Sequence, residues 1–222
     1  MTKVSDLKTI KETIYFTLKD EICNGQYFPG SQVQEQEIAG RFNSSRSPVR
    51  EALKQLVADG LLEEFPNRGV FIRKYTEKDI CDIFDLRIIL EGYAIKKIDD
   101  NLTPGKIVAL NNLLSDLRKH HEENDVNKYI INDANLHHQI VVMCKNNPVI
   151  STYEKLSDMM RQFRIYTFKD SDNFDKSLKD HEEIINYLLD GEPRKAYEVN
   201  RTHLLKARDI ILEGVRNYYK DL

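Results

Sequence analysis

The sequence contains few cysteines, and they form neither a disulfide framework nor a cysteine-based metal motif. The 222-residue chain has three, Cys23, Cys81 and Cys144, which lie far apart and include no CxxC pair. An odd number of widely spaced cysteines is typical of reduced thiols inside a cytoplasmic protein. We therefore interpret all three as reduced core residues.

Long hydrophobic runs are also missing. The chain has no stretch of about eighteen apolar residues, which is the length that a membrane-spanning helix needs. Residues 1–16, MTKVSDLKTIKETIYF, lack the hydrophobic region of a signal peptide. The sequence thus predicts a cytoplasmic protein without a membrane partner.

An excess of charge of one sign is absent as well. The formal net charge is −3 at pH 7, which excludes strong binding to nucleic acid through bulk positive charge. Any affinity for DNA must come from a few well-placed arginines, doubled by dimerisation. The length suffices for one or two domains with a buried core.

What the sequence does contain is a compact motif at residues 36–75. A short helix and a turn precede a second helix, in which apolar residues recur at helical spacing from Val49 to Val57. Ser47 and Pro48 are predicted to be the N-cap and the first residue of that helix. Gly60 is predicted to end it. This is the layout of a helix-turn-helix.

A predicted hairpin follows the second helix. Residues 61–65 and 70–73 can pair as strands across the turn at residues 66–69, where proline and glycine supply the bend. Arg68 would lie at the tip of this hairpin. A helix-turn-helix followed by such a wing is typical of proteins that insert one helix into the DNA major groove.

Two arginines lie near the start of the second helix. Arg50 occupies a different face of this helix from the apolar residues, and Arg46 lies just before the helix start. Arginine is the usual partner of guanine O6 and N7, because its planar fork matches two acceptors at once. We therefore predict that both contact bases. The alternative is a small helix–hairpin core with two solvated arginines.

Beyond Tyr75 the pattern becomes helical throughout. Predicted helices begin near Thr76 and Thr103 and then cover residues 126–145, 148–169, 171–189 and 193–219. Each break contains Pro, Gly, Asn or Asp, as helix ends should. About six antiparallel helices joined by short loops form a bundle. We therefore predict a mostly α fold with two domains, a winged helix-turn-helix at 1–75 and an all-α bundle at 76–222.

A candidate metal site lies within the predicted bundle. Asp133 and His137 are four residues apart and share one helix face. His181 and His203 fall on later helices. Imidazole nitrogens with one carboxylate suit zinc, nickel, manganese or iron. The spacing alone is weak evidence, because a lone histidine on a half-apolar helix is more often an ordinary core or surface residue.

The helix-turn-helix resembles a known family. The string SSRSPVREAL at residues 44–53, followed by DGLLEE and the PNRG wing, resembles the GntR family of bacterial transcription regulators. This resemblance implies that operator DNA is contacted by five residues: Ser45, Arg46, Ser47, Arg50 and Gly69. Some members carry an arginine where this chain has Gln36. Glutamine can still bond to a base or a phosphate, but it brings no charge.

The bundle resembles the ligand-binding FCD domain of the FadR-like branch of that family. DANLH at residues 133–137, DHEEI at 180–184 and the segment from Ala196 to Leu204 match its ligand signatures. The resemblance implies a divalent transition metal, zinc first, held by Asp133, His137, His181 and His203. Open coordination sites would remain for water or a carboxylate.

Arg87 and Glu91 match an R-x-x-x-E pattern in the first bundle helix of that branch. Residues four apart on a helix can form a salt bridge worth a few tenths of a kcal/mol. Alternatively, Arg87 faces a cavity and pairs with a ligand carboxylate. The two interpretations carry equal weight on the sequence alone.

Together these features predict a metabolite-responsive transcription regulator that is not an enzyme, with a repressor as the expected form. A homodimer would place two recognition helices on a pseudo-palindromic operator. A small carboxylate metabolite would bind the metal in the bundle. The alternatives are a metal-dependent hydrolase, a regulator whose metal is structural or itself the signal, and a bundle that serves dimerisation alone.

Overall fold

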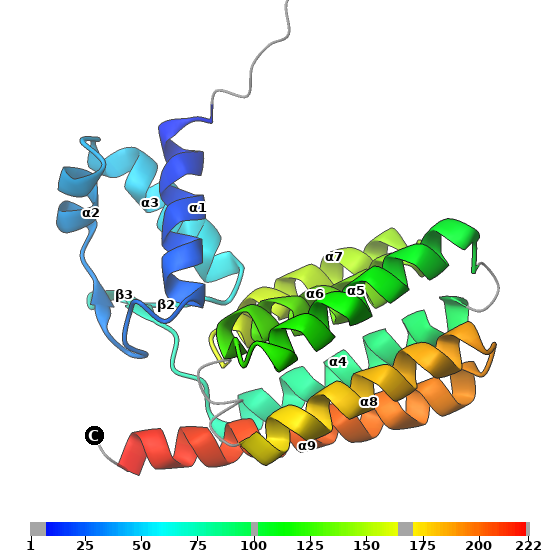
Figure 1. The fold of residues 1–222 in the computed structure, drawn as a ribbon. Helices are drawn as coiled ribbons and strands as arrows, with labels where there is room; N and C mark the ends of the chain where they lie inside the picture. The colour runs from blue at the N-terminus through cyan, green and yellow to red at the C-terminus, as the bar shows by residue number, and fades with distance from the viewer. Residues whose placement is uncertain (1–7, 99–101, 164–170, 221–222) are drawn as a thin grey trace, which may run out of the picture. The chain divides into compact units, whose positions relative to one another are not determined.

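The computed structural model describes residues 8–98, 102–163 and 171–220. The chain divides into two compact units, residues 1–75 and 76–222. Helices dominate both units, and the first also holds a three-stranded sheet (Figure 1). This composition confirms the predicted mostly α fold.

The N-terminal unit combines three helices with a small antiparallel sheet. Its elements are, in order, α1 Ile10–Cys23, β1 Gln32–Val33, α2 Glu35–Arg41, α3 Arg46–Ala58, β2 Leu62–Phe65 and β3 Gly69–Ile72. A capping box starts α1, because the Thr9 hydroxyl accepts from the Glu12 amide and the Glu12 carboxylate accepts from the Thr9 amide. The buried side chains of α1 pack against α3, the second helix of the predicted helix-turn-helix, and this packing fixes the position of α3.

The start of α3 differs from the prediction. The N-cap is Ser45 rather than Ser47, and the helix begins at Arg46, so that Pro48 is its third residue. Proline is tolerated there because the amides of the first turn have no acceptor within the helix. The other end agrees with the prediction. Gly60 has a φ of 76°, and its amide bonds to the Val57 carbonyl at 3.0 Å.

The wing is a hairpin of β2 and β3, closed by the register Phe65↔Gly69. Asn67 and Gly69 both have positive φ, at 60° and 93°, as the tight turn requires. A third strand, β1, was not predicted from the sequence and pairs with β3. A strand of two residues carries no periodic signal. It nevertheless steadies the wing, because Gln32 Nε2 donates to the Arg68 carbonyl at 2.8 Å.

The C-terminal unit is a bundle of six helices within the described residues. They are α4 Glu77–Ile98, α5 Pro104–Glu122, α6 Val126–Val142, α7 Asn147–Arg161, α8 Ser171–Leu189 and α9 Pro193–Lys220. None of the described helices is long and apolar enough to cross a membrane. The six helices α4 to α9 confirm the prediction of about six bundle helices.

Two helix ends depart from their predicted positions. α6 stops at Val142 rather than Lys145, whose φ of 56° cannot continue a helix. α7 ends at Arg161. The remainder of the predicted helix, up to residue 169, falls largely outside the described residues.

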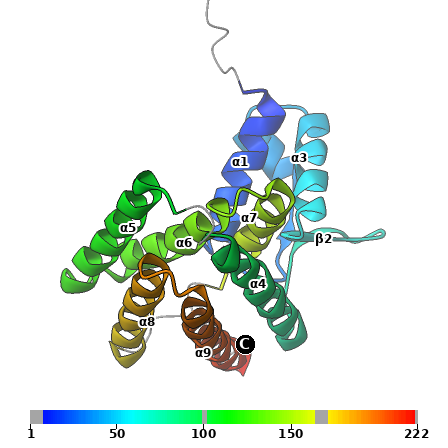
Figure 2. The ribbon, with the colours of Figure 1, turned by 90° about the vertical axis from the view of Figure 1, so that its right-hand side faces the viewer.

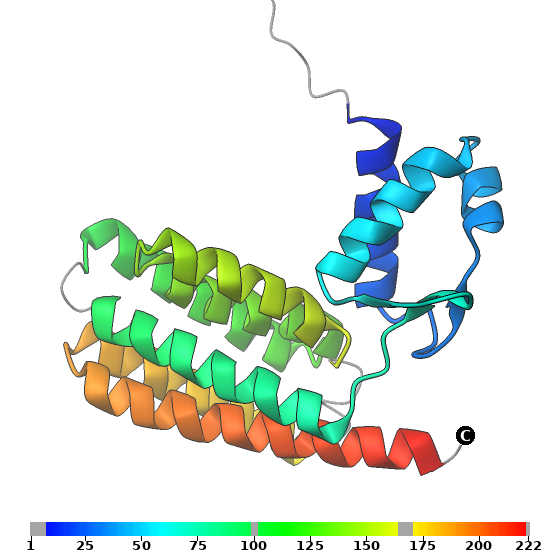
Figure 3. The same cartoon turned by 180° about the vertical axis from the view of Figure 1, so that it is seen from behind.

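The pairing of α4 with α9 organises the bundle interior. Figures 2 and 3 show α9 lying alongside both α4 and α8. Gly92 permits the close approach, since a Cβ atom there would lie 2.6 Å from a ring atom of Tyr197. This contact brings the polar residues in the middle of α9 toward those of α4.

Candidate metal centre and DNA-recognition surface

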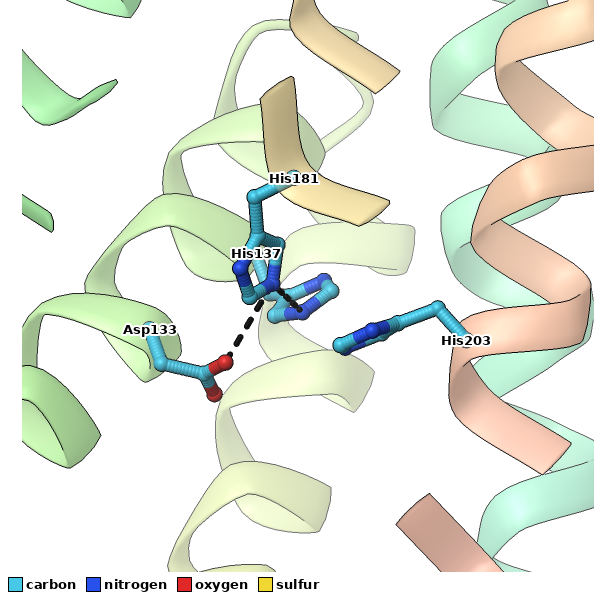
Figure 4. A group of neighbouring side chains, drawn as sticks. All are labelled: Asp133, His137, His181 and His203. Atoms are coloured by element: carbon cyan, nitrogen blue, oxygen red, sulfur yellow. Dashed lines mark hydrogen bonds and ion pairs between the residues drawn. The ribbon is translucent and has the colours of Figure 1, made fainter. Parts of the chain in front are cut away.

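Four side chains from three helices converge inside the bundle. Asp133 and His137 lie on α6, His181 lies on α8 and His203 lies on α9. One donor atom from each lies within 4.8 Å of the other three. Figure 4 shows the carboxylate and the three rings turned toward a common point. The structure thus brings together all four residues that the sequence grouped as metal ligands.

The spacing of the donor atoms suits a single ion. His181 Nε2 lies 3.2 Å from His137 Nε2 and 3.2 Å from Asp133 Oδ1. The His203 ring centroid is 4.5 Å from that of His181. Zinc binds nitrogen at about 2.0–2.1 Å, so two ligand atoms around one tetrahedral ion lie roughly 3.3 Å apart.

The outer nitrogen of each histidine has its own partner. His137 Nδ1 lies 2.9 Å from Glu91 Oε2, and His203 Nδ1 lies 3.4 Å from Asp180 Oδ2. His181 Nδ1 lies 3.3 Å from the Tyr129 hydroxyl, which donates to Ser177 Oγ at 3.1 Å. A carboxylate or an already donating hydroxyl favours the tautomer with a proton on Nδ1. The lone pairs on Nε2 then point inward.

The charge states fit a divalent cation. Burial disfavours the imidazolium form and lowers the pKa of both His137 and His181. For Asp133, burial acts to raise the pKa, but His181 and its neighbours outweigh it and hold the pKa below its ordinary value. Neutral imidazoles beside an ionised carboxylate are the ligand forms that zinc and similar metals require.

Glu91 forms the second layer of this site. Its carboxylate is fully buried and accepts from four partners on four helices. The donors are Arg87 Nε and the Tyr153 hydroxyl on Oε1, and His137 Nδ1 and Asn200 Nδ2 on Oε2. Burial acts to raise the pKa of Glu91, but Arg87 and His137 hold it below its ordinary value. One ionised carboxylate therefore orients both a candidate metal ligand and a buried guanidinium.

A cavity of about 730 Å³ adjoins the donor cluster. Its lining includes Asp133, His203 and Arg87. Arg87 is 8% exposed, and its Nε lies 2.7 Å from Glu91 Oε1. Arg87 thus forms the intrahelical salt bridge with Glu91 that the first interpretation predicted. It also lines the cavity, as the second interpretation predicted.

The other three histidines lie outside the cluster. Each instead lies beside an acidic side chain, and the pairs are His120 with Glu123, His121 with Asp175 and His138 with Glu154.

The residues proposed to contact DNA lie on the surface of the N-terminal unit. Arg46 and Arg50 are exposed on the first turns of α3, next to exposed Ser45 and Ser47. Arg46 Nη2 donates to Gln36 Oε1 at 2.9 Å, and Arg50 Nε donates to Glu35 Oε2 at 2.8 Å. Arg68 and Gly69 are exposed at the wing.

Comparisons with known proteins agree with this architecture. Residues 10–72 match the family described as "Bacterial regulatory proteins, gntR family", and residues 82–206 match the FCD domain. The chain belongs to the GntR-family regulators with an FCD domain. These domains serve transcription regulation, so the hydrolase alternative is not supported.

Full-length relatives support the assignment. The regulator is 28% identical over 208 residues to the uncharacterized HTH-type transcriptional regulator YdhC of Bacillus subtilis (strain 168), with 91% of each chain covered. It is 27% identical over 214 residues to the HTH-type transcriptional repressor GlaR of Escherichia coli (strain K12), covering 90% of this chain and 95% of GlaR.

Solved structures share the fold. A GntR transcriptional regulator from Rhodococcus sp. RHA1 matches with a TM-score of 0.77 and 22% identity, covering 91% of this chain and 97% of that one. A structure described as the metal-free FCD domain of TM0439 matches with a TM-score of 0.58 and 20% identity, covering 65% of this chain and 99% of that one.

Sequence reasoning missed the partners that hold the site residues. Glu91 was noted only as a partner of Arg87, and neither Glu35 nor Tyr129 was singled out. The four-residue spacing of Arg87 and Glu91 was the one available signal. The remaining contacts join residues that are distant in the chain, so no local pattern could have revealed them.

We expect Tyr129→Phe to lower the affinity of the regulator for zinc by about tenfold to a hundredfold. This substitution removes the hydroxyl that orients His181 and leaves the packing almost unchanged. Zinc affinity can be measured by competition with a chromogenic chelator.

Tyr153→Phe is the matched control, since it removes a buried hydroxyl that bonds to Glu91 rather than to a histidine. Its effect should be smaller, because Glu91 keeps three other donors. Equal losses in the two variants would show that the Tyr129 hydroxyl does not orient the donor set.

Proposed function

We propose that the protein is a metabolite-responsive repressor that binds a pseudo-palindromic operator as a homodimer. In this proposal residues 1–75 bind DNA, and residues 76–222 dimerise and sense a small carboxylate at a divalent metal, with zinc as the first candidate. The regulator would act in the cytoplasm, where a bacterial chromosome lies. The name of the relative GlaR supports repression as the mode of action.

One observation carries the sensing half of the proposal. Asp133 and His203, two members of the four-residue donor cluster, line a cavity that Arg87 also lines. A bound metal would supply a Lewis-acidic position for carboxylate oxygens. Arg87, held ionised by Glu91, would pair with the same carboxylate. A purely structural metal would need no adjoining cavity, so this observation favours an open site.

The exposed side chains of α3 support the DNA-binding half. Arg46, Ser47 and Arg50 would contact base edges in the major groove. Three further positions, Gln36, Ser45 and the wing at Arg68–Gly69, would contact the backbone and fix the register of the protein on DNA. Because the net charge is −3, these placed contacts must supply the affinity.

An exposed apolar stripe on α4 supports the homodimer. Leu86, Ile89 and Tyr93 are 38%, 65% and 39% exposed and share one face of the helix. A second copy of the chain could cover this stripe with its own in a two-fold arrangement, in which the same patch serves both subunits. Two copies would also present two recognition helices to the two halves of an operator.

The first experiment combines elemental analysis with operator binding. We expect about one zinc per chain in the wild type and much less in His137→Ala, because the substitution removes one of the four donors. On an operator selected from random DNA by the wild-type protein, an effector acid should change the dissociation constant by about fivefold to a hundredfold only when zinc is bound.

His138→Ala is the matched control, since its imidazole lies on the same helix beside Glu154 and outside the cluster. It should keep both the zinc and the response. A wild-type protein that stays metal-free after reconstitution would contradict the metal site. A zinc-bound protein whose DNA affinity responds to no carboxylate would instead favour a structural metal.

The dimer is tested by Ile89→Asp. A charge in the centre of the apolar stripe should weaken self-association by about thirtyfold or more, and operator affinity should fall with it. Sedimentation analysis and DNA titration measure the two effects. Ile131→Asp is the control, because Ile131 is 60% exposed on a different helix, α6. Equal behaviour of the two variants would place the dimer interface elsewhere.

A further inference from the structure

We infer that the effector is an amphipathic monocarboxylate with an apolar chain or ring, rather than a compact polycarboxylic or polyhydroxy acid. This inference rests on the proposed function, because it assumes that a carboxylate binds beside the metal donors. It adds the chemical nature of the rest of the molecule.

The cavity has one polar end and a largely apolar wall. Asp133, His203 and Arg87 form the polar end. Four apolar side chains from three helices form much of the wall, namely Phe84 on α4, Met160 on α7, and Ile210 and Ile211 on α9. A single carboxylate can satisfy this polar end, and these four side chains then offer carbon to the remainder of the ligand.

The size of the cavity excludes a snug fit for a very small acid. Its volume of about 730 Å³ lies well within the range of roughly 300–1,000 Å³ that holds drug-sized ligands. A two- or three-carbon acid would leave most of the apolar wall in contact with water. Covering that wall with hydrocarbon gains about 25 cal/mol for each Å² of apolar surface removed from water.

The other charged residues of the lining do not form a second acid-binding position. Lys176, Lys179 and Lys206 are exposed, and Lys206 already pairs with Asp180 at 3.2 Å. Asp209 and Glu183 also belong to the lining, so the local field has both signs. A second carboxylate placed against the apolar wall would lose its hydration without a buried partner.

The test is a calorimetric titration of zinc-loaded protein with unbranched acids from acetate to decanoate, and with citrate. We expect the dissociation constant to fall about threefold to fourfold for each added methylene, which corresponds to about 0.8 kcal/mol. The fall should continue until the chain covers the apolar wall. Citrate should bind no more tightly than acetate.

Met160→Gln should reduce this dependence on chain length relative to the wild type. The substitution nearly preserves volume and puts an amide on the cavity wall. Met159→Gln is the matched control, because Met159 is a half-buried neighbour on the same helix that does not line the cavity. The control should behave like the wild type in both affinity and thermal stability.

The outcomes separate the inference from the proposed function. If citrate or acetate binds as tightly as the longer acids, the inference is wrong and carboxylate sensing stands. If no carboxylate binds the zinc-loaded protein, carboxylate sensing is wrong and the inference fails with it. If Met160→Gln and Met159→Gln show the same dependence on chain length, the apolar wall does not contact the ligand.

A second observation, independent of the bundle, concerns α2. The geometry points to Glu35 as a positioning residue that determines DNA specificity by holding Arg50. Arg50 Nε lies 2.8 Å from Glu35 Oε2, and both side chains are solvent-accessible. A bond through Nε leaves the two terminal Nη groups, which form the edge that matches guanine O6 and N7.

The contact fixes a long side chain before DNA arrives. Ordering a flexible side chain at an interface costs free energy, which a preformed contact reduces. The carboxylate also places a negative charge close to the phosphates, which weakens binding to every sequence. Glu35 should therefore favour the correct sequence over others while lowering total affinity. Gln36, which accepts from Arg46 Nη2, holds the other arginine without a charge.

The test compares Glu35→Gln with Glu37→Gln on DNA selected by the wild-type protein and on unrelated DNA. Both variants remove one negative charge from α2, but Glu35 holds Arg50, whereas no described residue forms an ion pair with Glu37. Both should bind unrelated DNA more tightly. Only Glu35→Gln should lower the ratio of specific to nonspecific affinity, by about threefold to tenfold.

Thermal unfolding should be nearly unchanged in both variants, since exposed ion pairs contribute little stability. Reselection from random DNA with Glu35→Gln should show weaker preference at a guanine position. Equal specificity ratios for the two variants would overturn the inference, because only the shared loss of charge would then matter.

Discussion

The arrangement of the bundle interior depends on one buried carboxylate. Glu91 receives hydrogen bonds from side chains on α4, α6, α7 and α9, and it is fully excluded from solvent. An isolated carboxylate in that position would be very costly, whereas four donors, one of them a guanidinium, compensate for the lost hydration. The position of each donor is thereby tied to the others.

This shared partner links the two chemical parts of the site. Arg87 reaches the cavity from one side of Glu91, and His137 reaches the donor cluster from the other. Both side chains are therefore held by the same carboxylate, and neither can move without disturbing it. Similar support reaches His181 through Tyr129 and His203 through Asp180. The outer layer fixes which nitrogen of each ring faces inward.

The N-terminal unit meets a different constraint. A chain with a net charge of −3 cannot rely on bulk electrostatic attraction to DNA. Its recognition helix presents two arginines whose directions are set by α2, through Glu35 and Gln36. The wing is set in the same way, since Gln32 of the added strand bonds to the backbone of Arg68. In both cases the fixed positions of a few residues, rather than the net charge of the chain, supply the contacts proposed to bind DNA.

The elements with strong local signals could be predicted from the sequence. Helical spacing, turn residues and glycine stops identified the helix-turn-helix, the wing and the bundle helices. The family resemblance grouped Asp133, His137, His181 and His203, which the spacing alone supported only weakly. The strand β1 and the shift of the N-cap from Ser47 to Ser45 were missed, because two residues carry no periodicity and several hydroxyl residues compete for one cap.

The sequence by itself determined which residue types were available and on which helices they lie, since periodicity and turn chemistry are local properties. Only the tertiary structure decided what surrounds them. Three of the four donors of Glu91, the contact between Glu35 and Arg50, and the apolar wall around Met160 join residues from different elements of the chain. Such contacts arise from how helices pack, and packing depends on the shapes of many side chains at once.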